Sequence, residues 1–295
     1  MSQNPAAGLF VGLVTLDLIY LADHAPCNNQ KLVARDYTVA AGGPATNAAV
    51  AFGALGGKAI VLGAVGRHAL ARLIQTELRD CEVEVVDLAP DRLDAPPVSS
   101  IVVTQSTGER AVISINAVKA QADASAIPQD LQAVAIVLID GHQMSVGREI
   151  AARFKADRIP VVIDGGSWKP GFETVLPLAD YAICSANFQP PHCQDQAEVI
   201  SYLTGLGIPH IAITHGADPI VYHSEGHTGT ISVPQVQAID TLGAGDIFHG
   251  AFCHHILQTS FPEALQQAAT IAAQSCQFFG PRRWINEHGT DTLKA

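Results

Sequence analysis

The run from Asp240 to Asp246 combines small residues with two acids. It reads Asp-Thr-Leu-Gly-Ala-Gly-Asp, and an apolar helical pattern follows it at once. The first N–H groups of a helix have no partner within the helix and carry the positive end of its dipole, so small residues there let an anion approach. A carboxylate beside such an anion site is typical of phosphoryl transfer. We therefore predict Asp246 as the general base, and the charge-stabilising amides as those of Gly243, Ala244 and Gly245. An ordinary turn and helix cap is the alternative interpretation.

A second glycine-rich stretch lies well upstream and also opens an apolar helical pattern. It reads Ala-Gly-Gly-Pro-Ala-Thr-Asn and contains Gly42, Gly43 and Asn47. Glycine lets the backbone approach a ligand without interference from a Cβ atom, and an asparagine amide offers both a donor and an acceptor to a diol. These three residues are therefore predicted to bind the substrate. The alternative for Asn47 is a polar residue on a helix face.

Together the two stretches resemble the paired signatures of the ribokinase/PfkB family of carbohydrate kinases, an N-terminal Gly-Gly-x-x-x-Asn and a C-terminal Asp-Thr-x-Gly-Ala-Gly-Asp. The C-terminal match is complete, and the resemblance covers nearly the whole chain. It implies ATP-dependent phosphorylation of a sugar hydroxyl, with Mg²⁺ bridging the ATP phosphates. It also implies one ribokinase-like α/β domain over residues 1–289, with 290–295 as a flexible tail.

The resemblance assigns further residues. In the family an acid at the position of Asp17 holds sugar hydroxyls, whereas position alone equally suits a residue that caps a turn. Asp240 either organises the loop or forms a monovalent cation site, which would bind K⁺. Gly280 matches the glycine at the end of the region that walls the adenine pocket.

The resemblance implies that three other residues bind the nucleotide, and the position of Lys169 suggests a fourth. Thr214 and Gly216 match a Thr-x-Gly that contacts the nucleotide in relatives, and Asn187 matches the asparagine of an Asn-x-x-Glu. Lys169 is expected to reach a nucleotide phosphate as a point charge, although an exposed loop lysine is the commoner explanation. The glutamate of Asn-x-x-Glu is absent, because Pro190 stands in its place.

The missing glutamate leaves the arrangement of magnesium open. A proline has no side-chain ligand, so Asp164, Asp195, Glu198 or a network of waters would have to substitute. Magnesium usually keeps several waters and uses substrate phosphates, so the loss of one acid need not abolish its binding.

Apolar runs that alternate with helical patterns predict the elements that position these residues. Strands are expected over 9–14, 58–63, 135–139, 161–163, 181–184 and 210–214, with helices over 45–55, 69–80, 146–156, 197–206 and 264–279. Such alternation favours a doubly wound, mainly parallel sheet with helices on both faces. The carboxyl ends of its strands would then bring Asp17, Asp140, Asp164 and Thr214 to one edge.

Two β-rich runs, 99–104 and 110–115, surround a glycine turn and predict a hairpin. With the segment after Asp17 they are expected to form the small β-sheet lid of the family, from about 15–40 and 97–117. A lid of this kind excludes water from the phosphoryl group. Since the same lid often mediates dimers in relatives, a homodimer is expected.

Composition limits the class of partner. The formal net charge is −11, with 28 acids against 17 bases, which argues against binding to nucleic acid or to an anionic membrane. The six cysteines have the spacing of neither a disulfide framework nor a zinc site. No apolar run approaches the length of a membrane span and no basic secretory region opens the chain, so a cytoplasmic location is expected.

The substrate is harder to predict. Residues 10–17, 33–38 and 240–246 look most like the ketohexokinase and sulfofructose kinase branch, which favours a ketose or related sugar. A nucleoside similar to adenosine, or a catalytically silent protein that binds a sugar or nucleotide, are the alternatives. A Rossmann dehydrogenase is disfavoured because the first strand is not followed by Gly-x-Gly-x-x-Gly.

Overall fold

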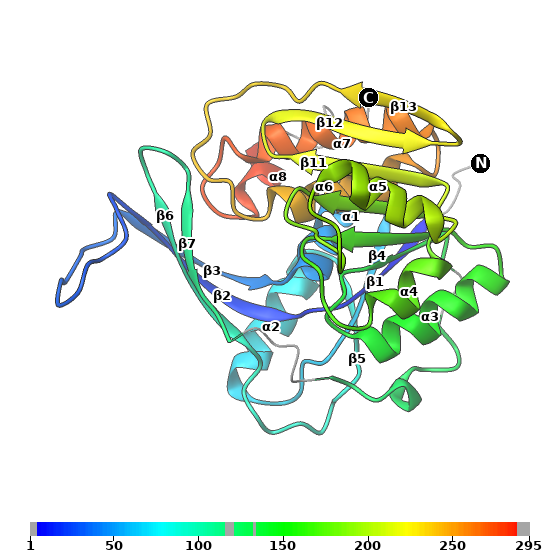
Figure 1. Cartoon of the computed structure of the whole chain (residues 1–295). Helices are drawn as coiled ribbons and strands as arrows, with labels where there is room; N and C mark the ends of the chain where they lie inside the picture. The colour runs from blue at the N-terminus through cyan, green and yellow to red at the C-terminus, as the bar shows by residue number, and fades with distance from the viewer. Residues whose placement is uncertain (1–4, 116–120, 132–133, 288–295) are drawn as a thin grey trace.

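The computed structural model describes residues 5–115, 121–131 and 134–287, and within them a nine-stranded sheet runs in the order β13-β12-β11-β10-β9-β8-β1-β4-β5 (Figure 1). Its strands are β1 (Ala7–Val11), β4 (Lys58–Gly63), β5 (Glu84–Asp87), β8 (Ile136–Ile139), β9 (Val161–Gly165), β10 (Tyr181–Ser185), β11 (His210–His215), β12 (Asp218–Ser224) and β13 (His227–Ile231). Neighbours from β11 to β5 pair in parallel, whereas β12 and β13 pair antiparallel. The mainly parallel sheet predicted from the sequence is confirmed.

Helices cover both faces of this sheet, because alternate residues of each central strand point to opposite sides. In β1, Phe10 joins one core cluster while Leu9 and Val11 join the other. The cluster with Phe10 includes α1 (Pro44–Ala54), α2 (Ala69–Asp80), α6 (Ala244–His255) and α7 (Phe261–Ser275), followed by the short α8 (Arg283–Glu287). The other includes α3 (Met144–Ala156), α4 (Phe172–Val175) and α5 (Gln196–Gly205), with 3₁₀ turns at Ala124–Ala126 and Leu176–Leu178.

Local sequence explains where several helices begin and end. In α2, Ala71, Ile74 and Leu78 are buried at helical spacing, and the helix has the bounds that the sequence predicts. A capping box of Ser260 and Glu263 opens α7. The prediction that this helix runs from 264 to 279 is wrong at both ends. It ends at Ser275, and the next carbonyl, that of Cys276, accepts from the amides of Ile239 and Asp240.

A second, four-stranded sheet stands at one side of the molecule in the order β3-β2-β6-β7 (Figure 1). It consists of β2 (Thr15–Ala22), β3 (Asp36–Gly42), β6 (Val98–Thr104) and β7 (Arg110–Ile113). The predicted hairpin is confirmed, since β6 and β7 pair antiparallel, while β2 pairs parallel to β6 and antiparallel to β3. We call these four strands the lid sheet. Residues 116–117 of the expected lid segment, and the expected tail 290–295, lie outside the described residues.

The prediction that Asp17 lies at the carboxyl edge of the main sheet is wrong. Strand β1 ends at Val11, the chain turns at Gly12, and Asp17 lies on β2 of the lid sheet. A Cβ atom on Gly12 would lie 2.0 Å from the carboxyl group of Asp140, so the turn needs glycine. Asp140 directly follows β8, and Asp164 and Thr214 lie near the carboxyl ends of β9 and β11.

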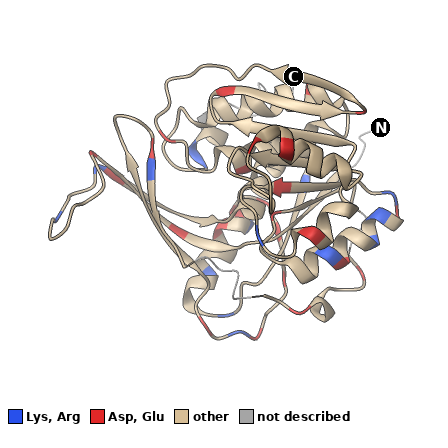
Figure 2. Cartoon of the chain, in the orientation of Figure 1, with Lys and Arg blue, Asp and Glu red and all other residues tan. Residues whose placement is uncertain are grey.

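The antiparallel hairpin β12–β13 was not among the predicted elements. Its polar and charged residues mask the alternation that marks a half-buried strand. No helix in the described part of the chain combines the length and the apolarity that a membrane crossing requires. In the view of Figure 2, Lys and Arg are interspersed with Asp and Glu over the ribbon.

Candidate active site

The glycine-rich run before α6 forms an open turn. Gly243 caps the helix with φ 74°, a left-handed conformation that favours glycine. A Cβ atom added to Gly245 would meet nothing within 4 Å, so the first helical turn faces open space on that side. The amide of Ala244 donates to the carbonyl oxygen of Thr241 at 3.4 Å. Because the first amides of a helix have no partner within it, the amide of Gly245 is the one suited to an anion. An open helix N-terminus of this kind could accept an anion, and the anion site itself stays a prediction.

Asp246 lies in the first turn of α6, and its Oδ2 accepts a hydrogen bond from Nδ2 of Asn47 at 2.8 Å. Burial, followed by the nearby charge of Asp164, raises the pKa of Asp246 to about 7, against the opposing effects of Asn47, His249 and Arg110. A carboxylate with a pKa close to neutral is well matched to proton transfer at neutral pH. The chemistry that this position supports is general base catalysis.

Asn47 is buried on α1 and uses both ends of its amide within the protein. While Nδ2 donates to Asp246, Oδ1 accepts from Nη1 of Arg282 at 2.9 Å. One N–H and one lone pair of the amide are left for a sugar. Sequence reasoning missed Arg282, which belongs to no motif and is marked only by its place just after Gly280 and Pro281.

Gly42 and Gly43 make room for protein groups. A Cβ atom on Gly42 would lie 1.9 Å from Oδ2 of Asp17, and one on Gly43 would lie 2.2 Å from the carbonyl oxygen of Leu13. Gly43 also has φ 101°, in the left-handed region. Both glycines are therefore required for packing against Asp17 and the turn before β2, and their contact with a substrate stays a prediction.

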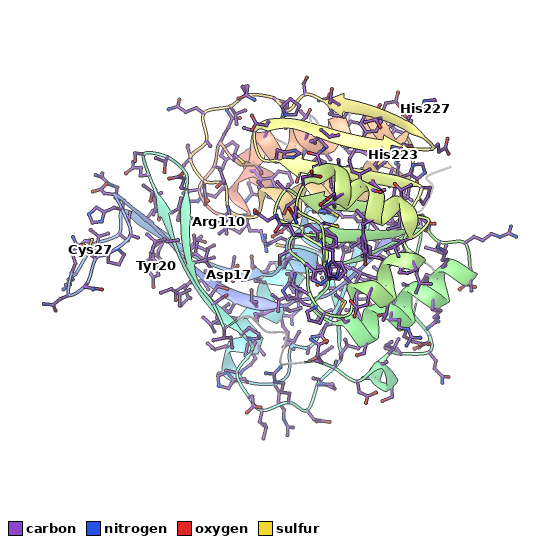
Figure 3. All side chains as sticks on the ribbon, viewed as in Figure 1. Asp17, Tyr20, Cys27, Arg110, His223 and His227 are labelled. Carbon is purple, nitrogen blue, oxygen red and sulfur yellow. The ribbon has the colours of Figure 1, made fainter. Side chains whose placement is uncertain are left out.

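Asp17 is buried on β2, beside the start of α1. Its Oδ1 accepts from Oγ1 of Thr15 at 2.8 Å. Burial raises the pKa of Asp17, while hydrogen bonds from Thr15 and Ser99 and the charge of Arg282 act to lower it. Figure 3 shows Asp17 at the base of the lid sheet and Arg110 further along the same sheet, both near the main body of the protein. Asp17 thus shares Arg282 as a neighbour with Asn47.

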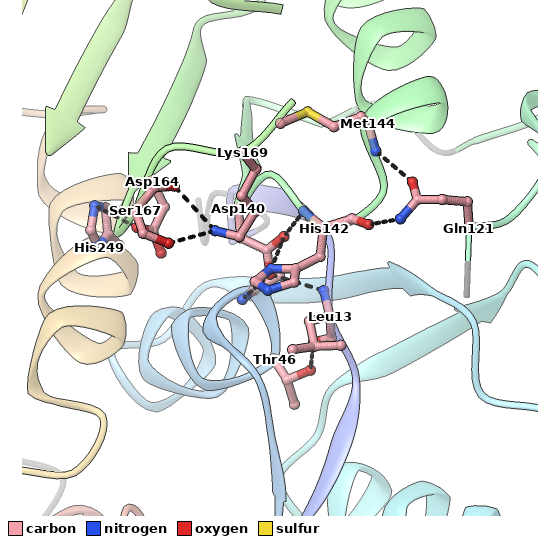
Figure 4. Close-up of polar contacts among 11 residues, drawn as sticks. Leu13, Thr46, Gln121, Asp140, His142, Met144, Asp164, Ser167, Lys169 and His249 are labelled. Atoms are coloured by element: carbon pink, nitrogen blue, oxygen red, sulfur yellow. Dashed lines mark hydrogen bonds and ion pairs between the residues drawn. The ribbon is translucent and has the colours of Figure 1, made fainter. Parts of the chain in front are cut away.

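Asp140 connects three segments of the site through its carboxylate (Figure 4). Its Oδ2 accepts from the backbone amides of Leu13 at 2.9 Å and Ala45 at 3.1 Å, and its Oδ1 lies 3.2 Å from Nδ1 of His142. Although burial acts to raise it, the contacts with His142 and Leu13 lower the pKa of Asp140. A buried, ionised acid with these partners joins β8 to the β1–β2 turn and to the first turn of α1.

Asp164 and His249 form a second buried pair beside the base. Oδ1 of Asp164 lies 3.7 Å from Nε2 of His249, and Nδ1 of His249 lies 2.7 Å from the carbonyl oxygen of Gly245 (Figure 4). Burial raises the pKa of Asp164, while the charges of His249 and Lys169 act to lower it. The acid is therefore placed where its charge acts on Asp246.

Two of the three acids considered as substitutes for the missing glutamate have other roles. Asp195 caps α5 by accepting from the amide of Glu198 at 2.9 Å, and Glu198 accepts from the amide of Gln194 at 2.6 Å. Asp164 is the acid of the three that lies beside Asp246. No group of three or more His, Cys, Asp or Glu side chains suited to a metal occurs among the described residues.

Three of the five residues expected to bind the nucleotide, Asn187, Thr214 and Gly216, lie near the carboxyl ends of β10 and β11. Asn187 is exposed, and its amide donates to Oγ of Ser185 at 3.1 Å. Thr214 lies on β11, and Gly216 has φ 65° in the turn to β12. A hollow lies beside them, and Ser185 and His215 are among the residues that line it. This edge of the sheet thus combines open space with polar groups.

Lys169 is partly buried in the loop between β9 and α4. Its Nζ donates to the carbonyl oxygen of Ser167 at 3.3 Å and lies 5.8 Å from the centre of the Phe172 ring. Its charge also acts on Asp164. The side chain is therefore folded back onto its own loop.

Asp240 connects the anion loop to the turn at Gly280. Oδ1 accepts from the amide of Leu242 at 2.8 Å, and Oδ2 accepts from the amide of Gly280 at 2.9 Å. Burial raises the pKa of Asp240, while these two amides act to lower it. Of the two roles considered for Asp240, these contacts favour organisation of the loop over a monovalent cation site.

The lid sheet is hydrogen-bonded to the anion loop, a contact that sequence reasoning missed. The carbonyl oxygen of Gly108, in the β6–β7 turn, accepts from the amide of Thr241 at 3.2 Å and from its Oγ1 at 3.0 Å. Nη1 of Arg110 donates to the carbonyl oxygen and to Oγ1 of Thr241, each at 3.3 Å. We call this set of contacts the Thr241 latch.

Comparisons with known proteins identify the family and the fold. Residues 8–287 match the model of the pfkB family carbohydrate kinases. The ribokinase of Haemophilus influenzae is 23% identical over 277 residues, which cover 90% of each chain. The structure of Arabidopsis thaliana ribokinase complexed with ribose and ATP matches with a TM-score of 0.75 and 21% identity, over 99% of this chain and 98% of that one. The adenosine kinase of Sinorhizobium meliloti matches with a TM-score of 0.80 and 17% identity, over 95% and 96%. At these identities the two structures show the fold alone.

Proposed function

This chain belongs to the pfkB family of carbohydrate kinases, and we propose that it transfers the γ-phosphoryl group of ATP to a hydroxyl of a small sugar. The observation that carries the proposal is the position of Asp246. Its carboxyl group, with a pKa of about 7, lies in the first turn of a helix whose N-terminal side is open at Gly245. A base and an anion site within one helical turn are what transfer of a phosphoryl group to an alcohol requires.

In the proposed reaction, Asp246 accepts the proton of the acceptor hydroxyl. The hydroxyl oxygen forms a new bond to the γ-phosphorus as the bond from that phosphorus to the leaving oxygen of ADP breaks. The amides of Gly243, Ala244 and Gly245 stabilise the charge on the transferring group, and interactions of this kind usually contribute most of the catalysis. Deprotonated Asp246 is regenerated when its proton is released to solvent.

Asp17 and the remaining groups of Asn47 are proposed to orient the sugar, because both lie at the junction of the lid sheet and α1. The lid sheet would limit the access of water, the main competing acceptor. Its connection to the anion loop through Thr241 supports this role.

ATP is proposed to lie along the carboxyl edge from α6 to β11. Asn187, Thr214 and Gly216 supply backbone and polar groups there, with Lys169 on the phosphate side. Gly280, whose amide donates to Asp240 and which lies against Thr38 of β3, would meet the nucleotide from the side of the anion loop. Mg²⁺ would arrive as the MgATP complex, since such complexes use phosphate oxygens and water more than a protein cage. We propose no K⁺ site at Asp240, because both oxygens of its carboxylate already accept backbone amides.

The acceptor is proposed to be a ketose, on the resemblance of residues 10–17, 33–38 and 240–246 to the ketohexokinase and sulfofructose kinase branch. The relatives found by comparison are ribokinases and deoxyribokinases, so a pentose is the second candidate. ADP release from MgATP, measured across ketohexoses, pentoses, sugar phosphates and nucleosides, tests the proposal. Turnover on a sugar supports it, and nucleoside-specific turnover identifies a nucleoside kinase. Tight binding without any turnover would mean a silent binding protein.

We further propose that two copies associate through the outer face of the lid sheet. Tyr20, Tyr37 and Val39 lie 40%, 67% and 43% exposed on that face, beside Ile113 at 78%. Tyr20 is directly opposite Tyr37 across the β2–β3 pair. Contiguous exposed apolar groups of this kind mark an interaction surface.

A further inference from the structure

Asn47 lies between a cation and the proposed base. Its Nδ2 donates to Oδ2 of Asp246 at 2.8 Å, and its Oδ1 accepts from Nη1 of Arg282 at 2.9 Å. A guanidinium carries only donors, so the amide oxygen must face Arg282 and the amide nitrogen must face Asp246. The orientation of the Asn47 amide is thus dictated by Arg282.

Arg282 is itself fixed by several partners. Its Nε donates to Oε1 of Glu77 at 3.0 Å, and its Nη2 donates to the carbonyl oxygen of Ala41 at 2.6 Å. The other oxygen of Glu77 accepts from the amide of Ala41. The side chains of Arg282 and Glu77 are 17% and 24% exposed. A planar guanidinium held at several nitrogens has little freedom to turn, so the donor aimed at Asn47 is held in one place.

We propose that Arg282 is a positioning residue for the general base. By holding Oδ1 of Asn47, it keeps Nδ2 of Asn47 on Oδ2 of Asp246. In the described part of the chain, the carboxylate of Asp246 has a hydrogen bond at Oδ2 alone, so Oδ1 is left for the acceptor hydroxyl. The consequence for turnover rests on the proposed kinase function, whereas the arrangement of the three side chains does not.

Arg282 could act on Asp246 in two ways, through the hydrogen bond of Asn47 or directly through its own positive charge. Asp164 on β9, His249 on α6 and Arg110 on β7 act on the base through their charges. The charge of Arg282 acts on Asp17. Because one amide separates Arg282 from Asp246, the charge of Arg282 can also act there directly. Arg282→Lys, which keeps the charge but not the forked contacts, isolates the effect of the Asn47 hydrogen bond.

Removal of the guanidinium would release the Asn47 amide. The amide would be held less firmly, so the hydrogen bond from its Nδ2 to the ionised form of Asp246 would weaken. Since a hydrogen bond to a charged group favours the charged form, the pKa of Asp246 is expected to rise by about one unit. At neutral pH the fraction of ionised base, and with it kcat, would fall about five- to tenfold.

The direct test is a carbon-13 NMR titration of the aspartate carboxyl groups in the substrate-free protein, with the Asp246 signal assigned from Asp246→Asn. Arg282→Met is expected to raise the pKa of Asp246 by about one unit. Arg283→Met is the matched control. It removes the same charge from the adjacent residue, whose guanidinium contacts Asp36 at 2.7 Å, and should leave that pKa unchanged. An unchanged pKa in folded Arg282→Met would overturn the proposal.

Should Arg282→Met not fold, Arg282→Lys provides the same test. Its single ammonium cannot maintain the forked contacts with Asn47, Glu77 and Ala41. We expect a smaller shift in the same direction, and an unchanged Asp246 pKa in the folded Lys variant would also contradict the proposal.

A double-mutant cycle gives the kinetic readout. If Arg282 acts through Asn47, adding Arg282→Met to Asn47→Ala should lower kcat less than twofold further. Losses that multiply would show that Arg282 acts by another route. Absence of turnover in the wild type would instead count against the proposed kinase function, and the NMR titration would still decide the role of Arg282.

Discussion

The amide of Asn47 and the carboxylate of Asp246 meet at 2.8 Å although 199 positions separate them in the chain. Asn47 closes the first glycine-rich motif and Asp246 closes the second, so the contact joins the two motifs that the sequence singles out. Helices α1 and α6 pack side by side and bring them together. A sugar held beside Asn47 would therefore lie next to the base.

The pKa of Asp246 predicts the pH dependence of turnover. Because the base must be ionised and its pKa is about 7, kcat is expected to fall about tenfold per unit below pH 7 and to level off above it. Initial rates between about pH 5 and 9, with saturating MgATP and sugar, measure this fall in kcat at acid pH. A rate that stays constant down to about pH 5 would contradict the raised pKa.

The same shift predicts an effect on stability. The pKa of Asp246 is raised from 3.8 to about 7 in the folded protein. The folded state thus binds the proton more tightly, and the stability linked to this group is present at acid pH and lost as the pH rises through 7. Asp246→Asn, which has no charge to bury, should raise the Tm at about pH 8 and have little effect near pH 4. Equal changes in Tm at both pH values would argue against this linkage.

Two glycine-to-alanine substitutions test different roles: one glycine is proposed to leave room for the phosphoryl group, and the other leaves room for a protein side chain. In Gly245→Ala the new methyl group enters open space, so the Tm should hold or rise, since alanine favours a helix by about 1 kcal/mol. Activity should nevertheless fall at least tenfold, because the methyl group occupies the proposed anion site. Kinetics and thermal melts of one preparation check both parts.

Gly42→Ala is the counterpart. Its Cβ atom would lie 1.9 Å from Oδ2 of Asp17, so the Tm should drop and the KM for the sugar should rise. A Gly42→Ala protein with normal Tm and KM would show that Asp17 can move without cost.

The Thr241 latch predicts a coupling between the lid sheet and the anion loop. Thr241→Val removes the hydroxyl that donates to Gly108, and Arg110→Met removes the guanidinium above it. Each is expected to lower kcat/KM for the sugar about five- to tenfold, as for the loss of one or two exposed hydrogen bonds. Arg35→Met is the control, because Arg35 pairs with Asp23 elsewhere on the lid. An equal loss of kcat/KM in Arg35→Met would show that the Thr241 latch has no specific role in turnover.

The outer face of the lid sheet predicts the oligomeric state. Sedimentation of the wild type should give a dimer, and Tyr37→Asp, which places a charge in the apolar face, should give a monomer. Leu93→Asp serves as control, since Leu93 is 68% exposed outside that sheet. A wild-type monomer at micromolar concentration, or a dimer that survives Tyr37→Asp, would rule out this surface.

Much of the architecture follows from local pattern. Most of the parallel strands and the helix over 69–80 are found where the sequence predicts them, because burial on both faces leaves a continuous apolar run in each central strand. The partly exposed parallel strand β5 at the edge was not predicted, and β1 ends at Val11 rather than at residue 14. The β12–β13 hairpin lacks such a run and escaped prediction.

The site was predicted less completely than the fold. The two motifs marked Asp246 and Asn47, but no spacing rule marked Arg282 or Thr241, since their roles arise only when distant segments meet. Asp17 was placed on the wrong sheet because the sequence does not show that the chain turns at Gly12. The reason for that turn, the carboxyl group of Asp140, lies 127 residues further along at its contact with Leu13.

The central claim is that Asp246 is the base of a sugar kinase. Its most direct test is the turnover of Asp246→Asn on the sugar that the wild type phosphorylates best, with ATP binding and thermal melting as checks on the fold. We predict a fall in kcat of roughly 10² to 10⁴ with ATP binding retained, as expected for removal of a general base. Near-normal turnover in a folded Asp246→Asn protein would contradict the account.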